Sequence, residues 1–337
     1  MVTIADVAEA ANVSISTVSY VMSGKRKISQ ETQDRVARAI EELGYRPHAG
    51  ARALASRSTS IIGLQAPLRP GVDVHVVMEI VTGVATGARG HDYDILLLTS
   101  DDTTGLERAA NSSMVDALIV MDVESDDERL GILAGLHQPC VLIGLPSEPG
   151  NLACVDFDFE AAGHLAVEHL TAQGHRRVAL IGSPAEVMAR HTSYADRLAR
   201  GFTAAAAQAG IAVSIHPCPS TPDAVAVIDE VFAAQPDTTA LFIHNEEALP
   251  HLLARLSERG QRIPADIAVV ALCPPNVART LRVPVDTIDI PAEEIGMAAA
   301  DVVWEMIADG AAPSVRLIPP TLSLRPGLPL SAPSPAR

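Results

Sequence analysis

Lysine is almost missing from this chain of 337 residues. Its only two lysines, Lys25 and Lys27, lie in the segment "SGKRKIS" at residues 23–29, and every other cation outside histidine is an arginine. Aromatic residues make up only 3% of the chain, so its cores must be aliphatic. No apolar run reaches the roughly 18–20 residues of a membrane-spanning helix. The first residues also lack the basic and apolar regions of a signal peptide. We therefore expect a cytoplasmic protein.

Motifs of metal sites and enzymes are also missing. The four cysteines, Cys140, Cys154, Cys218 and Cys273, form no C-x-x-C pair and have no histidine at a zinc-finger spacing. H-E-x-x-H, G-x-S-x-G, a P-loop and a full G-x-G-x-x-G are all absent. We therefore expect reduced, buried thiols, no metal or cofactor, and no enzymatic activity.

Charge is unevenly distributed along the chain, whose formal net charge is −16. Residues 1–60 hold eight Lys and Arg against six Asp and Glu, a balance of +2. The remainder therefore holds 25 − 8 = 17 basic and 41 − 6 = 35 acidic residues, a balance of −18. A weakly basic head on an acidic body suggests that the head binds a polyanion such as DNA, while the body stays away from it.

The head shows the pattern of three short helices. Thr3 can cap the first, "IADVAEAA", Ser14 the second, "ISTVSYVMS", and Ser29 the third, "QETQDRVARAIEEL", which Gly44 ends. Two helices joined by a tight turn, with a third covering them, form a helix-turn-helix whose second helix enters the major groove. A small helical bundle with no DNA role is the alternative.

The whole head resembles the N-terminus of LacI/GalR-type bacterial repressors. The matching pieces are "TIADVAEAANVSISTVS", the start of the third helix, "LGYRP" and "ARALA". The resemblance implies that residues 48–56 form a hinge helix, ordered on an operator, whose Leu54 beside Ala51 wedges into the minor groove. Without it, the stretch 48–59 would be taken for a linker. Many family members carry Arg or His where this chain has Tyr20, which leaves the base preferred there open.

The candidate DNA contacts fall into three groups. The second helix and its cap offer hydroxyls and one apolar side chain to base edges, the following loop offers cations to phosphates, and the hinge offers its wedge. The set is Thr3, Ser14, Ile15, Ser16, Thr17, Ser19, Tyr20, Lys25, Arg26, Lys27, Ala51 and Leu54. A merely solvated charged loop is the alternative for the two lysines and Arg26.

The body alternates apolar strands with helical stretches twice, which indicates two lobes of parallel sheet covered by helices. "EHLTAQGHRRVALIG", "GQRIPADIAVV" and "PVDTIDIPAEEIG" resemble landmarks of the same family and imply a periplasmic-binding-protein-like core. The expected organisation is a helix-turn-helix domain at 1–47, a hinge at 48–59, a two-lobed core at 60–327 (one lobe 60–158 plus 291–318, the other 159–290 plus 319–327), and a disordered tail at 328–337.

Effector contacts are expected where strands end at the cleft between the lobes. Asp73, His75 and Asp122 follow strands of the first lobe. Resemblance to the family's effector loop adds Arg190, Thr192 and, after a one-residue shift, Arg197. Asn245 and Glu246 stand where many relatives have Asn-Asp, and Cys273 stands where many have a ligand-holding Asp. Each of these residues could instead be a solvated loop end.

The leading hypothesis is a dimeric repressor that binds a palindromic operator and is controlled by a sugar or other metabolite in the cleft. With Cys273 in place of an acid and two arginines nearby, an anionic effector is an alternative. We favour effector-induced release from DNA at the nucleoid. A corepressor mechanism is one alternative, and an intracellular solute-binding module with a vestigial head is another.

Overall fold

The computed structural model describes residues 2–23, 26–45, 58–66, 68–69, 71–100, 103–112 and 114–324. Several sequence predictions lie outside these residues. They are the hinge helix with Ala51 and Leu54, Lys25 of the basic loop, and the tail from residue 328. They stay predictions.

The head is a bundle of three helices, α1 (Ile4–Ala10), α2 (Ile15–Ser23) and α3 (Gln30–Leu43). Thr3 caps α1 in a capping box with Asp6, and the Ser14 hydroxyl accepts a 3.1 Å hydrogen bond from the Thr17 amide. Gly44 ends α3 in the left-handed region at φ 60°, where glycine is favoured. The prediction that the Ser29 side chain caps α3 was wrong, because its hydroxyl bonds to the Thr32 hydroxyl instead, at 2.9 Å.

The N-terminal lobe is a sheet of six parallel strands in the order β11-β5-β4-β3-β1-β2. The strands are β1 (Ile61–Gln65), β2 (Asp94–Leu98), β3 (Ala117–Val120), β4 (Cys140–Ile143), β5 (Ala153–Phe157) and β11 (Val315–Ile318). Helices α5 (Val74–Gly90) and α14 (Ala292–Asp309) pack on the face that carries Ile119 and Val141. Helices α6 (Thr103–Asn111) and α7 (Leu130–Leu133) pack on the face that carries Leu118 and Leu142.

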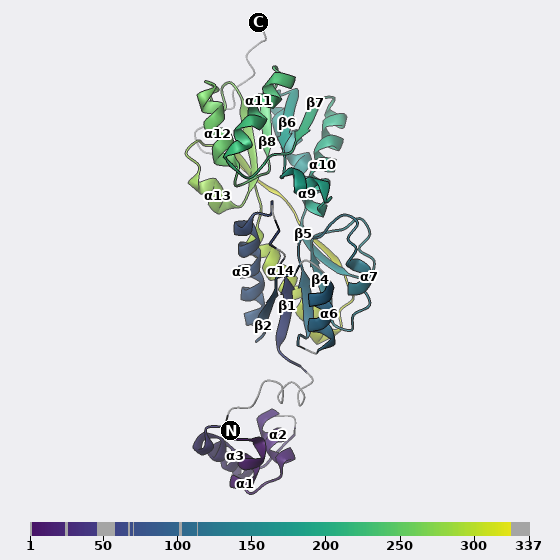
Figure 1. The fold of residues 1–337 in the computed structure, drawn as a ribbon, viewed down its shortest axis with the longest axis vertical. Helices are drawn as coiled ribbons and strands as arrows, with labels where there is room; N and C mark the ends of the chain where they lie inside the picture. The colour runs from purple at the N-terminus through teal and green to yellow at the C-terminus, as the bar shows by residue number, and fades with distance from the viewer. Residues whose placement is uncertain are drawn as a thin grey trace.

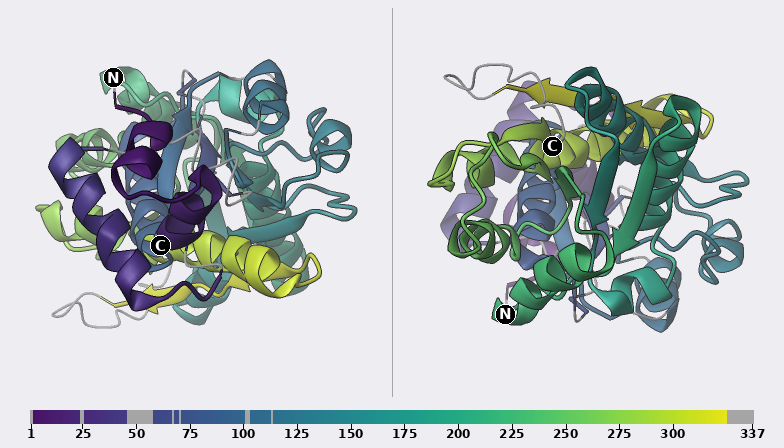
Figure 2. Two further views of the ribbon diagram at one scale, coloured as in Figure 1. Left: turned by 90° about the horizontal axis from the view of Figure 1, so that it is seen from below. Right: turned by 90° about the horizontal axis from the view of Figure 1, so that it is seen from above.

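The C-terminal lobe has a six-stranded sheet in the order β12-β10-β9-β8-β6-β7, parallel except for β12. The strands are β6 (Arg177–Ile181), β7 (Ala212–His216), β8 (Ala240–Ile243), β9 (Ala268–Cys273), β10 (Asp286–Asp289) and β12 (Thr321–Ser323). Seen from above, helices lie on both sides of this sheet (Figure 2). They are α8 (Phe159–Ala172) and α10 (Ser193–Ala209) on one face, and α11 (Val225–Ala234) and α12 (Leu249–Glu258) on the other. Three short helices complete the lobe: α9 (Ala185–Ala189), η1 (Pro222–Ala224) and α13 (Pro275–Thr280).

The predicted fold class, a helix-turn-helix head followed by two lobes of mainly parallel sheet, is confirmed. The two lobes follow one another along the long axis of the molecule (Figure 1). The chain passes between their sheets three times, after β5, after β10 and after β11. Crossing segments placed in this way bring the carboxyl ends of the strands of both lobes toward one cleft.

Close helix packing in both lobes depends on glycine. A Cβ on Gly83 of α5 would overlap the carbonyl oxygen of Glu293, and one on Gly296 of α14 would overlap that of Ile80. The second lobe repeats this arrangement, with Gly163 of α8 against α10 and Gly201 of α10 against α8. In each lobe, therefore, two helices pack with their backbones in direct contact: α5 with α14, and α8 with α10.

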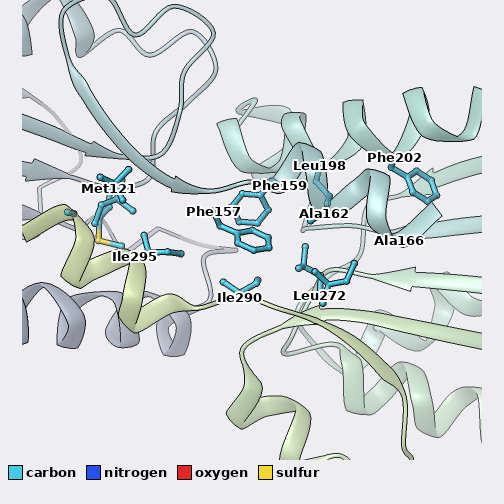
Figure 3. Packing of buried hydrophobic residues seen from close by; sticks show 14 of the residues in the cluster. Met121, Phe157, Phe159, Ala162, Ala166, Leu198, Phe202, Leu272, Ile290 and Ile295 are labelled. Atoms are coloured by element: carbon cyan, nitrogen blue, oxygen red, sulfur yellow. The ribbon is translucent and has the colours of Figure 1, made fainter. Parts of the chain in front are cut away.

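One hydrophobic core continues from lobe to lobe through the crossing segments. The same buried cluster contains Met121 of the first lobe, Leu272 of the second, and Phe157, Phe159 and Ile290 of the crossing segments. Figure 3 shows these crossing residues lying between the residues of the two lobes. The lobes therefore share apolar packing at their junction.

Candidate functional site

The recognition helix α2 presents its polar face and buries the opposite one. Val18 is fully buried in the head core, whereas Ile15 is 51% exposed and Tyr20 is 38% exposed. Ser16 is exposed, and Thr17 and Ser19 are half-buried. The hydroxyl of Ser14 lies 2.8 Å from both the Ser16 and Thr17 hydroxyls. This chain of hydroxyls can donate to or accept from a base edge or a phosphate.

The described part of the basic loop lies beside this face. The Arg26 guanidinium carbon is 5.6 Å from the centre of the Tyr20 ring, within the range of a cation–π contact. Lys27 is exposed. Thr3 is exposed at the N-terminus of α1, where its hydroxyl already bonds to Asp6 at 2.9 Å. The predicted contacts of the head that the structure describes are therefore on its surface, and Arg26 and Tyr20 are joined.

A cavity that is partly open to solvent lies between the lobes. Its lining comes from the segments that follow strands of both sheets and from the crossing segments. Four of the predicted effector contacts line it: Asp73, Asp122, Asn245 and Glu246. The other five, His75, Arg190, Thr192, Arg197 and Cys273, are not among its lining residues.

Arg190 joins the two lobes instead of lining the cavity. It follows α9 in the second lobe, and its guanidinium lies 3.0 Å from Asp122 Oδ2 and 3.2 Å from Glu124 Oε1, both in the first lobe. Arg69 lies 3.3 Å from the same two carboxylates. The backbones are linked here as well, because the Ser193 amide donates to the Val123 carbonyl at 2.9 Å.

Arg197 is buried and holds the start of the crossing segment. Its guanidinium lies 2.7 Å from Asp156 Oδ2 and 3.2 Å from Asp158 Oδ1. Burial raises the pKa of Asp156 to about 7, although the Arg197 charge opposes the rise. Both arginines are therefore paired with carboxylates of the chain. Neither supplies the free cation on which the hypothesis of an anionic effector depended.

The amide of Asn245 is partly used within its own lobe. Its Nδ2 donates to the Cys218 carbonyl at 2.8 Å, and its Oδ1 accepts from the Ser220 hydroxyl at 3.1 Å and from the Ala248 amide at 3.0 Å. Asn245 thus shapes the loop after β8, and among the described residues one N–H of its amide is left for a ligand.

The three remaining predicted contacts have other surroundings. Thr192 is fully buried, and its hydroxyl donates to the Val187 carbonyl at 3.3 Å. Cys273 is fully buried in the core under α11 and α12. His75 is exposed, and its Nε2 lies 3.2 Å from Asn276 Nδ2 of the opposite lobe.

The sequence analysis did not predict three ring side chains that line the cavity. Phe159, Tyr194 and His244 all line it, with ring centroids 5.5–5.7 Å apart. His244 directly precedes Asn245, so the sequence predicted a contact at the end of this strand but named only the residue after His244. Phe159 and Tyr194 lie in the first turns of α8 and α10, and their position beside His244 depends on tertiary structure.

Four of the lining residues are acidic: Asp73, Asp122, Asp156 and Glu246. Burial, together with repulsion from Asp73, Glu247 and Glu79, raises the pKa of Glu246 to about 8. Burial lowers the pKa of His244 to about 4, so its imidazole is neutral at pH 7. Among the described residues that line the cavity, none is a lysine or an arginine.

The described residues contain neither a metal-binding cluster nor a membrane-spanning helix. No group of three or more His, Cys, Asp or Glu there could hold a metal ion. No helix in that part of the chain is long and apolar enough to cross a membrane.

Two family models match the chain. Residues 3–48 match the model of bacterial regulatory proteins of the lacI family, and residues 167–327 match a periplasmic binding protein-like domain. Together they cover the head and most of the second lobe.

Whole-length relatives agree with these models. Catabolite control protein A of Priestia megaterium is 26% identical over 88% of this chain and 90% of its own. The transcriptional repressor PurR of Aliivibrio fischeri strain MJ11 is 29% identical over 92% of this chain and 93% of its own. These relatives are regulators rather than enzymes.

Solved structures show the same architecture. The transcriptional regulator CelR in complex with cellobiose is 26% identical, with a TM-score of 0.67 over 96% of this chain and 99% of its own. The lac repressor dimer bound to operator and the anti-inducer ONPF is 22% identical, with a TM-score of 0.81 over 95% of this chain and 97% of its own, and shares the fold. The head of the chain thus matches the lacI family of bacterial regulatory proteins, and the whole chain is similar in sequence to regulators of that kind.

Proposed function

We propose that this protein is a dimeric repressor that binds a palindromic operator and is controlled by a small molecule in the interlobe cavity. The observation that carries the proposal is the pairing of two features in one chain. The exposed face of α2 is suited to the major groove, and the cavity lies where both lobes contribute lining residues.

Exposed apolar side chains on the N-terminal lobe support self-association. Val74 and Met78 of α5 are 47% and 45% exposed, and Leu97 of the edge strand β2 is 43% exposed. Apolar side chains grouped on one surface favour contact with a second copy. A dimer about a two-fold axis would present two heads to two half-sites. In the lac repressor, such a dimer is seen on its operator.

The contacts proposed for DNA follow from the sequence prediction. Ile15, Ser16, Thr17, Ser19 and Tyr20 read bases, and Lys25, Arg26 and Lys27 position the backbone. Thr3 and Ser14 lie beside them. Ala51 and Leu54 of the hinge enter the minor groove at the centre, and we place this activity at the nucleoid. Effector binding rearranges the lobes and releases the DNA.

Selection from a randomised pool of duplexes tests the proposal directly. The full-length protein should enrich a palindrome, and its affinity should fall steeply with salt. Leu54→Ala should lose specific binding while non-specific binding persists. Enrichment of no sequence would contradict the proposal and favour a solute-binding module. Stronger operator binding in the presence of an effector would favour the corepressor mechanism.

A further inference from the structure

We infer that the effector carries a basic nitrogen, protonated at neutral pH, on a compact apolar or ring-shaped body. The inference rests on the proposed function, since it takes the interlobe cavity as the effector site. It names the chemical class of that effector: an amine rather than an acid, a phosphate ester or an uncharged polyol.

The two guanidinium groups beside the cavity are already paired with carboxylates of the protein. Arg190 is paired with Asp122 and Glu124, and Arg197 with Asp156 and Asp158. The Asn245 amide donates one of its two N–H groups to the Cys218 carbonyl at 2.8 Å. An anionic ligand would therefore meet carboxylates and find no free cation among the described lining residues.

The groups left for a ligand are mainly acceptors. Glu246, beyond β8, makes no side-chain hydrogen bond or ion pair with another described residue in the structure. Asp73 lies across the cleft from it at the start of α5, and among the described residues its carboxylate accepts only at Oδ1, from the amides of His75 and Val76 at 2.8 and 3.2 Å. A cation next to Glu246 favours the ionised form of its carboxyl group. Ionised carboxylates accept and do not donate, so the two acids match a ligand that is a cation and rich in donors.

His244 provides an independent sign that a ligand belongs here. Its side chain is 6% exposed and lines the cavity, yet neither ring nitrogen has a hydrogen-bond partner among the described residues. A neutral imidazole has one donor and one acceptor, and in the cavity both are left for a ligand.

The walls suit an apolar body that carries a positive charge. Phe159 and Tyr194 lie 5.5 Å apart on one side of the cavity, and Val76, Ile80 and Ile295 are among its apolar lining residues. Aromatic faces attract cations, and the effect grows when the cation is removed from water.

The two acids also explain how such a ligand would act on the lobes. Asp73 belongs to the first lobe and Glu246 to the second, and each repels the other. An ammonium group between them favours the ionised form of Glu246 and attracts both carboxylates. It would therefore favour the arrangement in which the lobes are closest at this point.

Matched sets of small molecules test the inference on the full-length protein. One set is phenethylamine, phenethyl alcohol and hydrocinnamate, and another is glucosamine, glucose and glucuronate. Binding is measured by ligand-observed NMR and by thermal shift. We expect the amine of at least one set to bind more tightly than its partners. Glu246→Gln should weaken that binding about tenfold or more, whereas Glu148→Gln, at an exposed position outside the lining, should leave it unchanged.

Several outcomes would overturn the inference. They are equal or tighter binding of the alcohols, sugars or acids, amine binding that Glu246→Gln does not weaken, and no binding in any set. If Glu246→Gln does not fold, Asp73→Asn takes its place. Operator binding is measured on the same preparation. Specific operator binding without an amine response refutes only the ligand class, whereas loss of specific operator binding refutes the proposed function.

Discussion

Arg190 of the second lobe lies 3.0 Å from Asp122 Oδ2 of the first, so one side chain ties the two walls of the cavity together. Asp122 lines the cavity and its side chain is 7% exposed, while the side chain of Arg190 is 24% exposed. The Arg190 pKa is raised by hydrogen bonds to Asp122 and by the Asp122 and Glu124 charges, which outweigh desolvation. The pair therefore stabilises one arrangement of the lobes.

Replacing Arg190 by Gln should loosen this arrangement. The loss removes a partly buried ion pair worth about 1 kcal/mol and leaves Asp122 with Arg69 alone. We expect faster limited proteolysis of the segments between the lobes and a larger radius of gyration by X-ray scattering. Arg262→Gln is the matched control, since its pair with Asp266 is exposed and lies within one lobe. An unchanged radius of gyration would show that Arg190 does not hold the lobes together.

Stability should depend on pH through Glu246. Its pKa is about 8 in the folded protein and close to its ordinary value of 4.5 in the unfolded chain. Between these values the folded state binds the extra proton, so the free energy of unfolding falls as pH rises from about 4.5 to about 8. Glu246→Gln should reduce this slope and stabilise the protein at pH 8 by at least about 1 kcal/mol. The measurement is Tm against pH, with Glu148→Gln, at an exposed position outside the cavity lining, as control.

The glycines between α5 and α14 should tolerate no side chain. Gly83→Ala places a methyl group against the Glu293 carbonyl and should cost about 2–3 kcal/mol of unfolding free energy. Gly90→Ala, in the same helix with nothing within 4 Å of the added carbon, should instead stabilise by about 0.5–1 kcal/mol. Urea denaturation measures both. Equal effects at the two positions would refute the packing argument.

Operator affinity should separate the two roles in the head. Arg26→Gln and Lys27→Gln should weaken binding to every sequence alike and flatten the dependence on salt by about 1 per lost phosphate contact. Ile15→Ala should instead reduce discrimination among operators and leave the salt slope unchanged. Fluorescence anisotropy with the selected palindrome and two mutated versions measures both quantities. A sequence-selective loss in Lys27→Gln would contradict the assignment.

Sequence periodicity predicted the fold well because each element carries its own local signal. The strand "ALFIHN" is buried where its apolar run lies, and Thr3 and Gly44 cap their helices as their chemistry requires. Ser29 shows the limit of such reasoning, because a hydroxyl next to a helix has other partners within reach. Its contact with Thr32 is decided by side-chain geometry.

The site was less predictable, since the same residue type can bind a ligand or its own protein. Arg190, Arg197 and Asn245 stand in the region of the cavity, yet their polar groups are occupied by Asp122, Asp156 and the Cys218 carbonyl. Those partners lie 27 to 68 positions away in the chain. No local sequence pattern predicts such pairing. The same holds for His244, whose ring nitrogens have no hydrogen-bond partner among the described residues.

The core that runs through Phe157, Phe159 and Ile290 limits how the lobes can move. Pulling them straight apart would bring these side chains into water, at about 25 cal/mol for each Å² of apolar surface. A twist about the crossing segments keeps the same side chains buried. In a dimer, it would change the distance between the N-terminal lobes of the two subunits at the ends that carry the heads. We therefore expect the two lobes to rotate relative to each other about the crossing segments. In a dimer, this rotation would change the spacing between the two DNA-binding heads.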